Sequence, residues 1–358
     1  MTSVDRHAAA AAPRAARWYV LLALLVGGFG WLYLSPRSSP AAWRGDTMGT
    51  TYTVKLAQPL DATKSEALGA VIRAELDAVV AAMSTYEPDS EVSRLARAPA
   101  GEAFEVSPAT MAVLRDAASV AEASGGAFDV TVRPLVDAWG FGAAGRTDRE
   151  PSEADLAQLA SSVGWDKLRL DGNTVTKASD AVQVDLSGIA KGYAVDRVAG
   201  ALEANGIEDY FVEVGGEARA RGHNERGAAW RVAVQRPGDG AIAVELDRQG
   251  VATSGNDKNF WERGGRRYGH TIDPRTHAPV RHRLAGASVI HTSTALADAW
   301  ATALMVLGEV EGSSVAEDQR LAAAFFVVTD EGVETKMTEA FEAFLADAGD
   351  PGDRERTP

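Results

Sequence analysis

The sequence contains no cysteine in its 358 residues. This absence excludes disulfides, zinc–thiolate sites, iron–sulfur clusters, a cysteine nucleophile and a lipid anchor on an N-terminal cysteine. Basic residues are in the minority, because 36 Lys and Arg stand against 50 Asp and Glu and leave a net charge of −14. Such an acidic surface argues against nucleic acid or anionic lipid as the main partner, but it is compatible with one small anionic ligand in a locally basic pocket.

The segment from Val184 to Gly192 is informative because it combines an acid, a capping residue and a lysine. Ser187 is typical of the N-cap of a helix, and Lys191 would then lie in the first turn. Helix starts carry unpaired N–H groups and a partial positive charge, so they attract phosphate. The segment has neither a P-loop motif nor a dinucleotide-binding motif. We predict a strand-to-helix turn that binds phosphate, with Asp185 placed to hold a cation or a ribose hydroxyl.

The N-terminus is predicted to be a separate module. Residues 1–17 contain three arginines, and residues 18–34 form an uncharged run with Trp and Tyr at both ends. At about 1.5 Å per residue, this run is close to the shortest helix that spans a bilayer. The positive flank predicts that everything after Pro36 lies outside the cytoplasm. We expect a single anchor in the inner membrane with the remaining chain on the periplasmic side; a cleaved signal peptide is the alternative.

The rest of the chain is predicted to hold one α+β domain. Residues 35–42 are a short linker, residues 43–345 form the domain, and residues 346–358 are a polar tail that we expect to be disordered. Helical spacing or capping signals predict helices within residues 68–83, 107–126, 152–164 and 187–206, and a hairpin within 168–177. Strand-like runs follow at 210–214, 230–235, 241–246, 287–291 and 325–328. Helices thus fall mainly in the first half and strands in the second.

A second candidate site lies near the C-terminus. Ser293 or Thr294 can cap a helix on which Asp298 and Thr302 share one face, among apolar neighbours. A buried carboxylate is costly unless it is paired or holds a metal, and a hydroxyl one turn away completes half of a hard-cation site. The alternative is an Asp that bonds to the backbone and a Thr that bonds to its own helix.

Two further segments carry candidate residues. In residues 125–135, glycines would let a ligand approach the backbone and Asp129 could accept a hydrogen bond from a ring; the alternative is a helix end followed by an ordinary strand. In residues 268–275, His270 is suited to proton transfer near neutral pH, although a lone histidine in a strand is often structural. Tyr86 could stack on a flat ring, with core packing as the alternative.

Taken together and in order, these segments resemble the ApbE-type FAD:protein FMN transferases. The matching segments are 48–50, 84–86, 126–135, 139–142, 184–192, 214–216, 254–256, 270–274 and 297–304. The resemblance implies a two-lobed, T-fold-related α+β catalytic domain. It also implies a Mg²⁺-dependent transfer of FMN from FAD to a Ser or Thr hydroxyl of a partner protein, an electron-transfer protein, with release of AMP.

The resemblance also implies roles for individual residues. The FAD site would be lined by Met48, Tyr86, Ala127, Phe128, Asp129, Asp185, Lys191 and Ile272. Mg²⁺ would be held by the backbone carbonyl near Gly188 together with Asp298 and Thr302, and His270 would accept the proton of the attacking hydroxyl. An enzyme that only hydrolyses FAD to FMN and AMP, and a non-catalytic flavin carrier, are the alternatives. The carrier would not need His270 or the metal ligands.

Overall fold

The computed structural model describes residues 39–142, 145, 150–238, 240–256, 260–263 and 266–346. The chain divides into Met1–Ser39 and Pro40–Pro358, and the fold described below belongs to the second unit. The predicted anchor at 18–34, the segment before it and the tail from 347 lie outside the described residues. Within the described ranges, no helix combines the length and apolarity that a membrane span requires.

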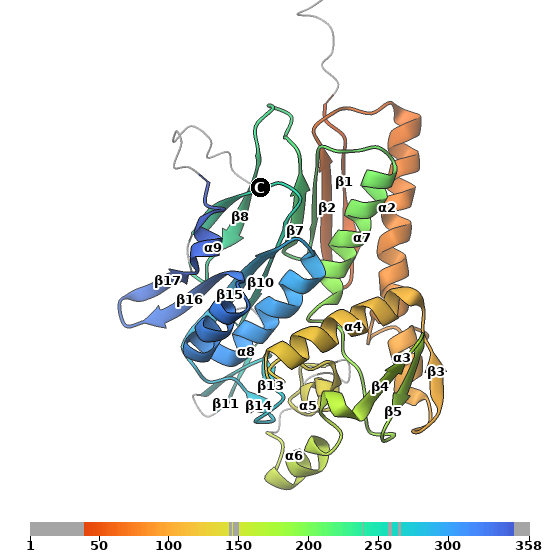
Figure 1. Cartoon of the computed structure of the whole chain (residues 1–358), viewed down its shortest axis with the longest axis vertical. Helices are drawn as coiled ribbons and strands as arrows, with labels where there is room; N and C mark the ends of the chain where they lie inside the picture. Colours follow the sequence, from red (N-terminus) through yellow and green to blue (C-terminus); the bar gives the residue numbers. More distant parts are fainter. Residues whose placement is uncertain are drawn as a thin grey trace, which may run out of the picture. The chain divides into compact units, whose positions relative to one another are not determined.

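An eight-stranded antiparallel sheet forms the centre of the domain (Figure 1). Its strands, in spatial order, are β1 (Ala42–Thr47), β2 (Thr50–Leu56), β6 (Tyr210–Val214), β7 (Glu217–Arg221), β10 (Gly250–Gly255), β15 (Leu284–His291), β16 (Ala322–Thr329) and β17 (Gly332–Met337). The central strands alternate their side chains between two apolar layers, because successive residues of a strand point to opposite faces. Val289 and Phe325 belong to the layer on the helical face, whereas Ile290 and Phe326 belong to the layer on the other.

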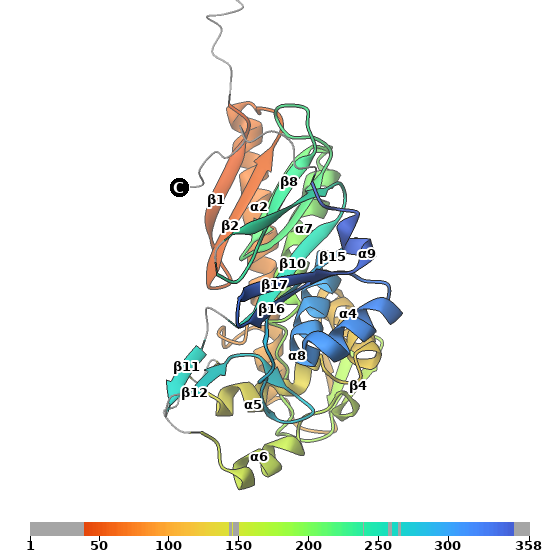
Figure 2. The same cartoon turned by 90° about the vertical axis from the view of Figure 1, so that its left-hand side faces the viewer.

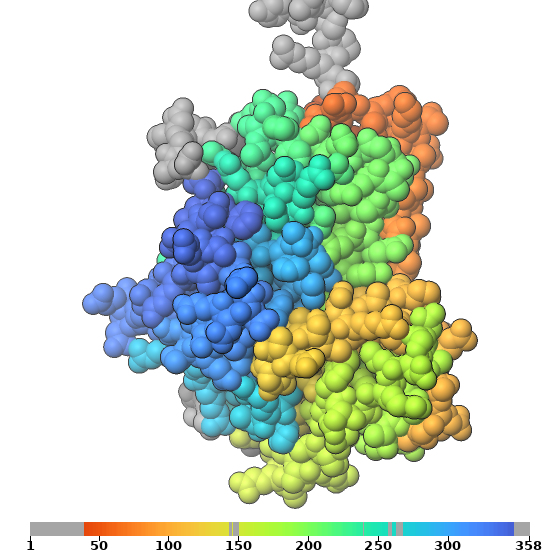
Figure 3. Space-filling view, in the orientation of Figure 1, coloured from red at the N-terminus to blue at the C-terminus, as the bar shows by residue number. Residues whose placement is uncertain are grey.

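Three long helices cover one face of this sheet (Figures 1 and 2). They are α2 (Ala62–Met83), α7 (Ala190–Ala204) and α8 (Thr294–Asp318), and α7 contacts both of the others. α8 is interrupted at Gly308, whose backbone (φ 76°, ψ −176°) is not helical. α4 (Pro108–Ala123) packs across α8, and the space-filling view shows the two in direct contact (Figure 3). The opposite face of the sheet is covered by the hairpin of β8 (Trp230–Gln235) and β9 (Ala241–Leu246) and by α9 (Glu339–Glu342).

Smaller elements complete the domain, and a few of them contribute residues to the candidate site. They are α3 (Glu91–Arg97), β3 (Ala103–Glu105), η1 (Val130–Val132), α5 (Arg133–Ala138), α6 (Glu153–Ala160), η2 (Trp165–Lys167), β4 (Leu168–Asp171), β5 (Thr174–Lys177), β11 (Phe260–Arg263), β12 (Arg266–Gly269), β13 (Ile272–Asp273) and β14 (Ala278–Pro279). Strands β3, β5 and β4 form a second sheet. Trp139, Trp261 and Tyr268 stack on one another and join the end of α5 to the β11–β12 hairpin.

The structure confirms the mixed α+β character and most of the predicted elements. Ser107 caps α4 by accepting a hydrogen bond from the Thr110 N–H, and Ser152 caps α6 in a reciprocal capping box with Asp155. The hairpin predicted within 168–177 is β4–β5. The strand considered as an alternative for the residues after the α4 end is not formed, because that segment folds as η1 and α5.

Candidate active site

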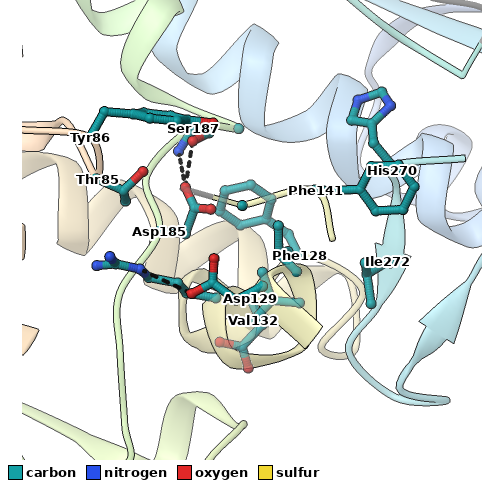
Figure 4. A pocket seen from close by; sticks show the side chains of 15 residues that line it. Thr85, Tyr86, Phe128, Asp129, Val132, Phe141, Asp185, Ser187, His270 and Ile272 are labelled. Atoms are coloured by element: carbon teal, nitrogen blue, oxygen red, sulfur yellow. Dashed lines mark hydrogen bonds and ion pairs between the residues drawn. The ribbon is translucent and has the colours of Figure 1, made fainter. Parts of the chain in front are cut away.

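A cavity of about 270 Å³ brings together seven of the residues singled out by the sequence. They are Tyr86, Phe128, Asp129, Asp185, Gly188, His270 and Ile272. Figure 4 shows Tyr86 and Asp185 on one side, His270 and Ile272 on the other, and Phe128 between them. These residues come from four separate segments of the chain, so the cavity exists only in the folded domain.

Asp129 contributes a buried carboxylate to the wall of this cavity. The residue is only 7% exposed, and its Oδ1 accepts hydrogen bonds from the Thr131 N–H (2.7 Å) and the Thr131 hydroxyl (2.6 Å). Burial raises the pKa of Asp129, and the two hydrogen bonds from Thr131 oppose that rise. The carboxylate is thus fixed in orientation and has lost part of its hydration, as suits a group that receives a ligand.

Asp185 and Ser187 form a tight turn, and this turn corrects one prediction. The Asp185 Oδ1 accepts hydrogen bonds from the Ser187 N–H (2.8 Å) and the Ser187 hydroxyl (2.5 Å). Ser187 is therefore not the N-cap of α7; the N-cap is Ile189, and the helix begins at Ala190. The prediction was wrong because the Ser187 hydroxyl donates to Asp185 instead of accepting from the first turn of α7, and such local hydrogen bonds compete with helix capping. Lys191 still lies in the first turn of α7, as predicted.

His270 lies at a bend between β12 and β13 rather than in a strand, and aromatic contacts hold it at the cavity. Its ring meets the Phe141 ring edge-on at a centroid distance of 6.4 Å. Two residues before it, Tyr268 stacks on Trp261 at 4.2 Å. After it, the chain is fixed by a hydrogen bond of 3.0 Å from the Trp139 indole N–H to the His277 carbonyl. The imidazole thus lines the cavity on a segment anchored on both sides.

Of the predicted metal ligands, Gly188 lines the cavity, and Thr302 lies beside Gly188. A Cβ built on Gly188 would lie 3.2 Å from the Thr302 hydroxyl oxygen, so Gly188 and Thr302 are in close contact. Asp298 is buried, and its Oδ2 accepts a hydrogen bond of 3.1 Å from the Gly192 N–H at the start of α7. Its Oδ1 lies 3.6 Å from the Lys191 ammonium. Thr302 therefore lies against Gly188, and Asp298, one helical turn earlier on α8, lies against the start of α7.

These donors suit a hard cation, which prefers oxygen ligands. Across the residues that the structure describes, there is no group of three or more His, Cys, Asp or Glu placed to hold a metal. A cation held here would therefore depend on the Thr302 hydroxyl and on backbone carbonyl oxygen in addition to Asp298. Mg²⁺ would fit such a donor set, because it is usually bound by few protein oxygens and keeps several water or phosphate oxygens.

Five predicted residues are not among the described residues that line the cavity: Met48, Ala127, Lys191, Asp298 and Thr302. Ala127 is buried in the main core beside Phe128. Met48 occupies the β1–β2 turn in the left-handed region (φ 50°), a conformation uncommon for a residue with a side chain. Lys191, Asp298 and Thr302 belong to the neighbouring group around Gly188 described above.

Two charged residues near the site were missed by sequence reasoning. Glu217 is 2% exposed and contacts the Lys191 ammonium at 2.9 Å. Burial raises the pKa of Glu217, and the nearby Lys191 ammonium opposes that rise. Burial alone would lower the pKa of Lys191, but Asp298 and Glu217 outweigh it and raise that pKa. The only signal for Glu217 was its place directly after the glycine pair at 215–216.

Arg133 is the second missed residue. It lines the cavity, its side chain is only 14% exposed, and its ion pair with Asp137 is long, at 3.8 Å. Its Nε and Nη1 atoms are buried and find no hydrogen-bond partner in the described part of the chain. A guanidinium in this state is a candidate donor to a ligand. The signal was an arginine within the glycine-flanked segment at 125–135.

Comparison with known proteins places this geometry in context. The sequence model of the ApbE family matches residues 48–326. The FAD:protein FMN transferase of Vibrio cholerae is 40% identical over 336 residues, which cover 92% of this chain and 99% of that protein. The FAD:protein FMN transferase of Haemophilus influenzae is 41% identical over 309 residues, covering 83% and 89% respectively.

Solved structures agree with the sequence relatives. The flavin transferase ApbE from Vibrio cholerae matches with a TM-score of 0.80 at 38% identity, covering 86% of this chain and 100% of that structure. The flavinyl transferase ApbE of Pseudomonas stutzeri in its apo form matches with a TM-score of 0.80 at 40% identity, covering 86% and 97%.

Proposed function

Because the chain belongs to the ApbE family and is an FAD:protein FMN transferase, we propose that it binds FAD in the cavity of Figure 4 and requires Mg²⁺. The Gly188 carbonyl, Asp298 and Thr302 would hold the cation. The observation that carries this proposal is the position of Gly188, which lines the cavity and also touches Thr302. A diphosphate in the cavity would therefore lie within reach of the oxygen donors.

The residues of the cavity divide into those that bind the nucleotide and those that act on the acceptor. Tyr86 is 69% exposed at the cavity and offers a ring face on which a flavin or adenine can stack. Asp129 and Asp185 present carboxylates that can accept hydrogen bonds from ring N–H groups or ribose hydroxyls. Met48, Ala127, Phe128, Lys191 and Ile272 complete the proposed FAD site.

The reaction moves FMN from FAD to the acceptor by a single phosphoryl-transfer step. The acceptor hydroxyl oxygen forms a bond to the phosphorus of the FMN half, the bond from that phosphorus to the AMP phosphate oxygen breaks, and AMP leaves. His270 is placed to take the hydroxyl proton on its imidazole. The start of α7 directs positive potential toward the phosphates. A bound Mg²⁺ would offset negative charge on the diphosphate oxygens.

We also propose where the enzyme acts and on what. The run at 18–34, with arginines before it, supports an anchor in the inner membrane and a transferase domain on the periplasmic side. The acceptor is a protein with a Ser or Thr flavinylation site, of the electron-transfer class implied by the resemblance. The acidic composition supports a protein rather than a nucleic acid as the partner.

The proposal is tested with Asp298→Ala, assayed with FAD, Mg²⁺ and an acceptor protein. We expect the FMN adduct on the acceptor, measured by mass spectrometry, to form at least about 100-fold more slowly, because loss of even the hydrogen-bonding partner of a metal ligand typically costs 10- to 100-fold. EDTA should reduce the wild-type rate in the same way. Asp318→Ala is the matched control, because Asp318 is exposed at the far end of the same helix. Normal adduct formation by Asp298→Ala would contradict the metal assignment.

A further inference from the structure

Glu217 stands on a turn that fixes its side chain inside the domain. The two residues before it, Gly215 (φ 62°) and Gly216 (φ 108°), both have positive φ and connect β6 to β7. The turn is held by a hydrogen bond of 2.8 Å from the Gly216 N–H to the Glu213 carboxylate. Because β6 and β7, on either side of this turn, belong to the central sheet, Glu217 at the start of β7 has little freedom to move.

The turn also shapes the path of the Lys191 side chain. A Cβ on Gly215 would lie 3.2 Å from Lys191 Cδ and 2.7 Å from Thr50 Cγ2. The aliphatic part of Lys191 therefore passes closely over a glycine and emerges between two buried carboxylates. Its ammonium lies 2.9 Å from Glu217 Oε1 and 3.6 Å from Asp298 Oδ1.

The three side chains bring two carboxyl groups and one ammonium together, and both carboxyl groups are almost fully buried. Glu217 is 2% exposed and Asp298 is 3% exposed. Glu217 Oε2 is buried and has no hydrogen-bond partner among the described residues. A buried carboxyl group of this kind destabilises the fold unless a partner compensates it. The partner of Glu217 is the Lys191 ammonium, which also faces Asp298, the proposed metal ligand.

We propose that Glu217 is a positioning residue that holds the Lys191 ammonium and thereby keeps the Asp298 carboxylate available for Mg²⁺. This inference rests on the proposed function, since it assumes that Mg²⁺ binds at Asp298. With Glu217 present, the ammonium keeps a carboxylate partner when a cation takes Asp298. Without it, Asp298 becomes the only carboxylate partner of Lys191, and a cation must compete with the ammonium for that carboxylate.

The test is Glu217→Gln, with Mg²⁺ binding to the purified full chain measured by isothermal titration calorimetry and by the Mg²⁺-dependent rise in melting temperature. We expect the dissociation constant for Mg²⁺ to rise by about 10-fold or more, in the range seen when the partner of a metal ligand is removed. The kcat for FMN transfer should recover at saturating Mg²⁺, while the half-saturating Mg²⁺ concentration shifts. Glu217→Asp, which keeps the charge, should restore part of the affinity.

Glu213→Gln is the matched control, because it removes a carboxylate from the same turn but leaves an amide oxygen to accept from Gly216. We expect wild-type Mg²⁺ affinity for this variant. The dependence on Lys191 is tested in a Lys191→Met background, where Glu217→Gln should weaken Mg²⁺ binding by less than about three-fold, since coupled residues are not additive. An equal loss in both backgrounds would overturn the role through Lys191.

The remaining outcomes separate the inference from the proposed function. If Asp298→Ala abolishes the Mg²⁺ response while Glu217→Gln binds Mg²⁺ as the wild type does, the metal site stands and the role of Glu217 is refuted. If Asp298→Ala binds Mg²⁺ normally, both the metal assignment and the inference fail. If Lys191→Met does not fold, the half-saturating Mg²⁺ concentrations of Glu217→Gln and Glu217→Asp decide, and equal values would refute the inference.

Discussion

The junction between α7 and α8 gives a sharp test of the packing around Asp298. Gly192 is the third residue of α7, and its N–H donates a hydrogen bond to the Asp298 carboxylate. A Cβ at this position would lie 2.2 Å from the Thr294 carbonyl oxygen, 2.6 Å from the Thr294 carbonyl carbon and 2.9 Å from the Ala295 Cα. All three atoms belong to the backbone, so no side-chain rotation can relieve the contact. Gly192→Ala must therefore push the two helices apart.

The size of the effect follows from this geometry. A normal contact would need each distance to grow to about 3.4 Å or more, and inserting a methyl group into a closed core typically costs about 1–3 kcal/mol, with larger values on record. Gly200 is the matched control, since it is exposed on the same helix and a Cβ there meets nothing within 4 Å among the described atoms. Gly200→Ala should stabilise the protein by about 0.5–1 kcal/mol, because glycine is a poor helix former.

The assay is urea unfolding of both variants, followed by circular dichroism without FAD or Mg²⁺. The two substitutions are chemically identical and lie eight residues apart on α7, so local propensity contributes similarly to both. We expect their free energies of unfolding to differ by at least about 1.5 kcal/mol, with Gly192→Ala the less stable. We also expect Gly192→Ala to slow FMN transfer, because it displaces the N–H that holds Asp298. Equal stability of the two variants would refute the close helix contact on which the site depends.

Two further predictions concern the cavity itself. Burial raises the pKa of Asp129, so the folded state binds its proton more tightly than the unfolded state and loses stability as the pH rises above the unfolded value. Asp129→Asn should therefore be more stable than the wild type at pH 7 but not at pH 4 in urea unfolding, while binding FAD more weakly; the opposite pH trend would contradict this. Trp261→Ala removes the ring that stacks on Tyr268 at 4.2 Å, so it should reduce the near-ultraviolet circular dichroism and slow FMN transfer through His270. An unchanged spectrum would show that the stack is absent in solution.

The elements that the sequence predicts well are those whose signals are local. Ser107 followed by Pro108 marks the start of α4 because the hydroxyl and the proline ring act on the same turn. The β4–β5 turn is equally local, since Gly172 adopts the positive φ (57°) that the turn needs. In both cases the information lies within four residues, so no knowledge of the tertiary structure is required.

The segment after Asp129 shows how a local preference is overridden. Val130, Thr131 and Val132 favour an extended strand by residue type. Asp129 instead accepts hydrogen bonds from Thr131 and starts a 3₁₀ turn, and Pro134 then lies in the first turn of α5. A side-chain cap and a fixed proline φ together outweigh the weak preference of β-branched residues, which depends mainly on packing against neighbouring strands.

Charged partners were the least predictable part of the site. Glu217 and Lys191 are 26 residues apart in sequence, and their 2.9 Å contact depends on how β7 packs against α7. No local pattern in the sequence indicates a contact between residues so far apart along the chain. Arg133 was visible as a residue type, but its burial beside the cavity depends on the packing of α5.

Asp298 shows why the metal and structural interpretations of a buried acid need not exclude each other. The sequence left a choice between a metal ligand and an aspartate bonded to the backbone. The structure provides the second arrangement through the Gly192 N–H and the Lys191 ammonium. A carboxylate intended for a cation still needs partners before the cation arrives, because a bare buried charge would destabilise the fold. Under the inference proposed above, the lysine shared with Glu217 would meet this need, since it would balance Asp298 before a cation binds and keep its own partner once Asp298 is engaged.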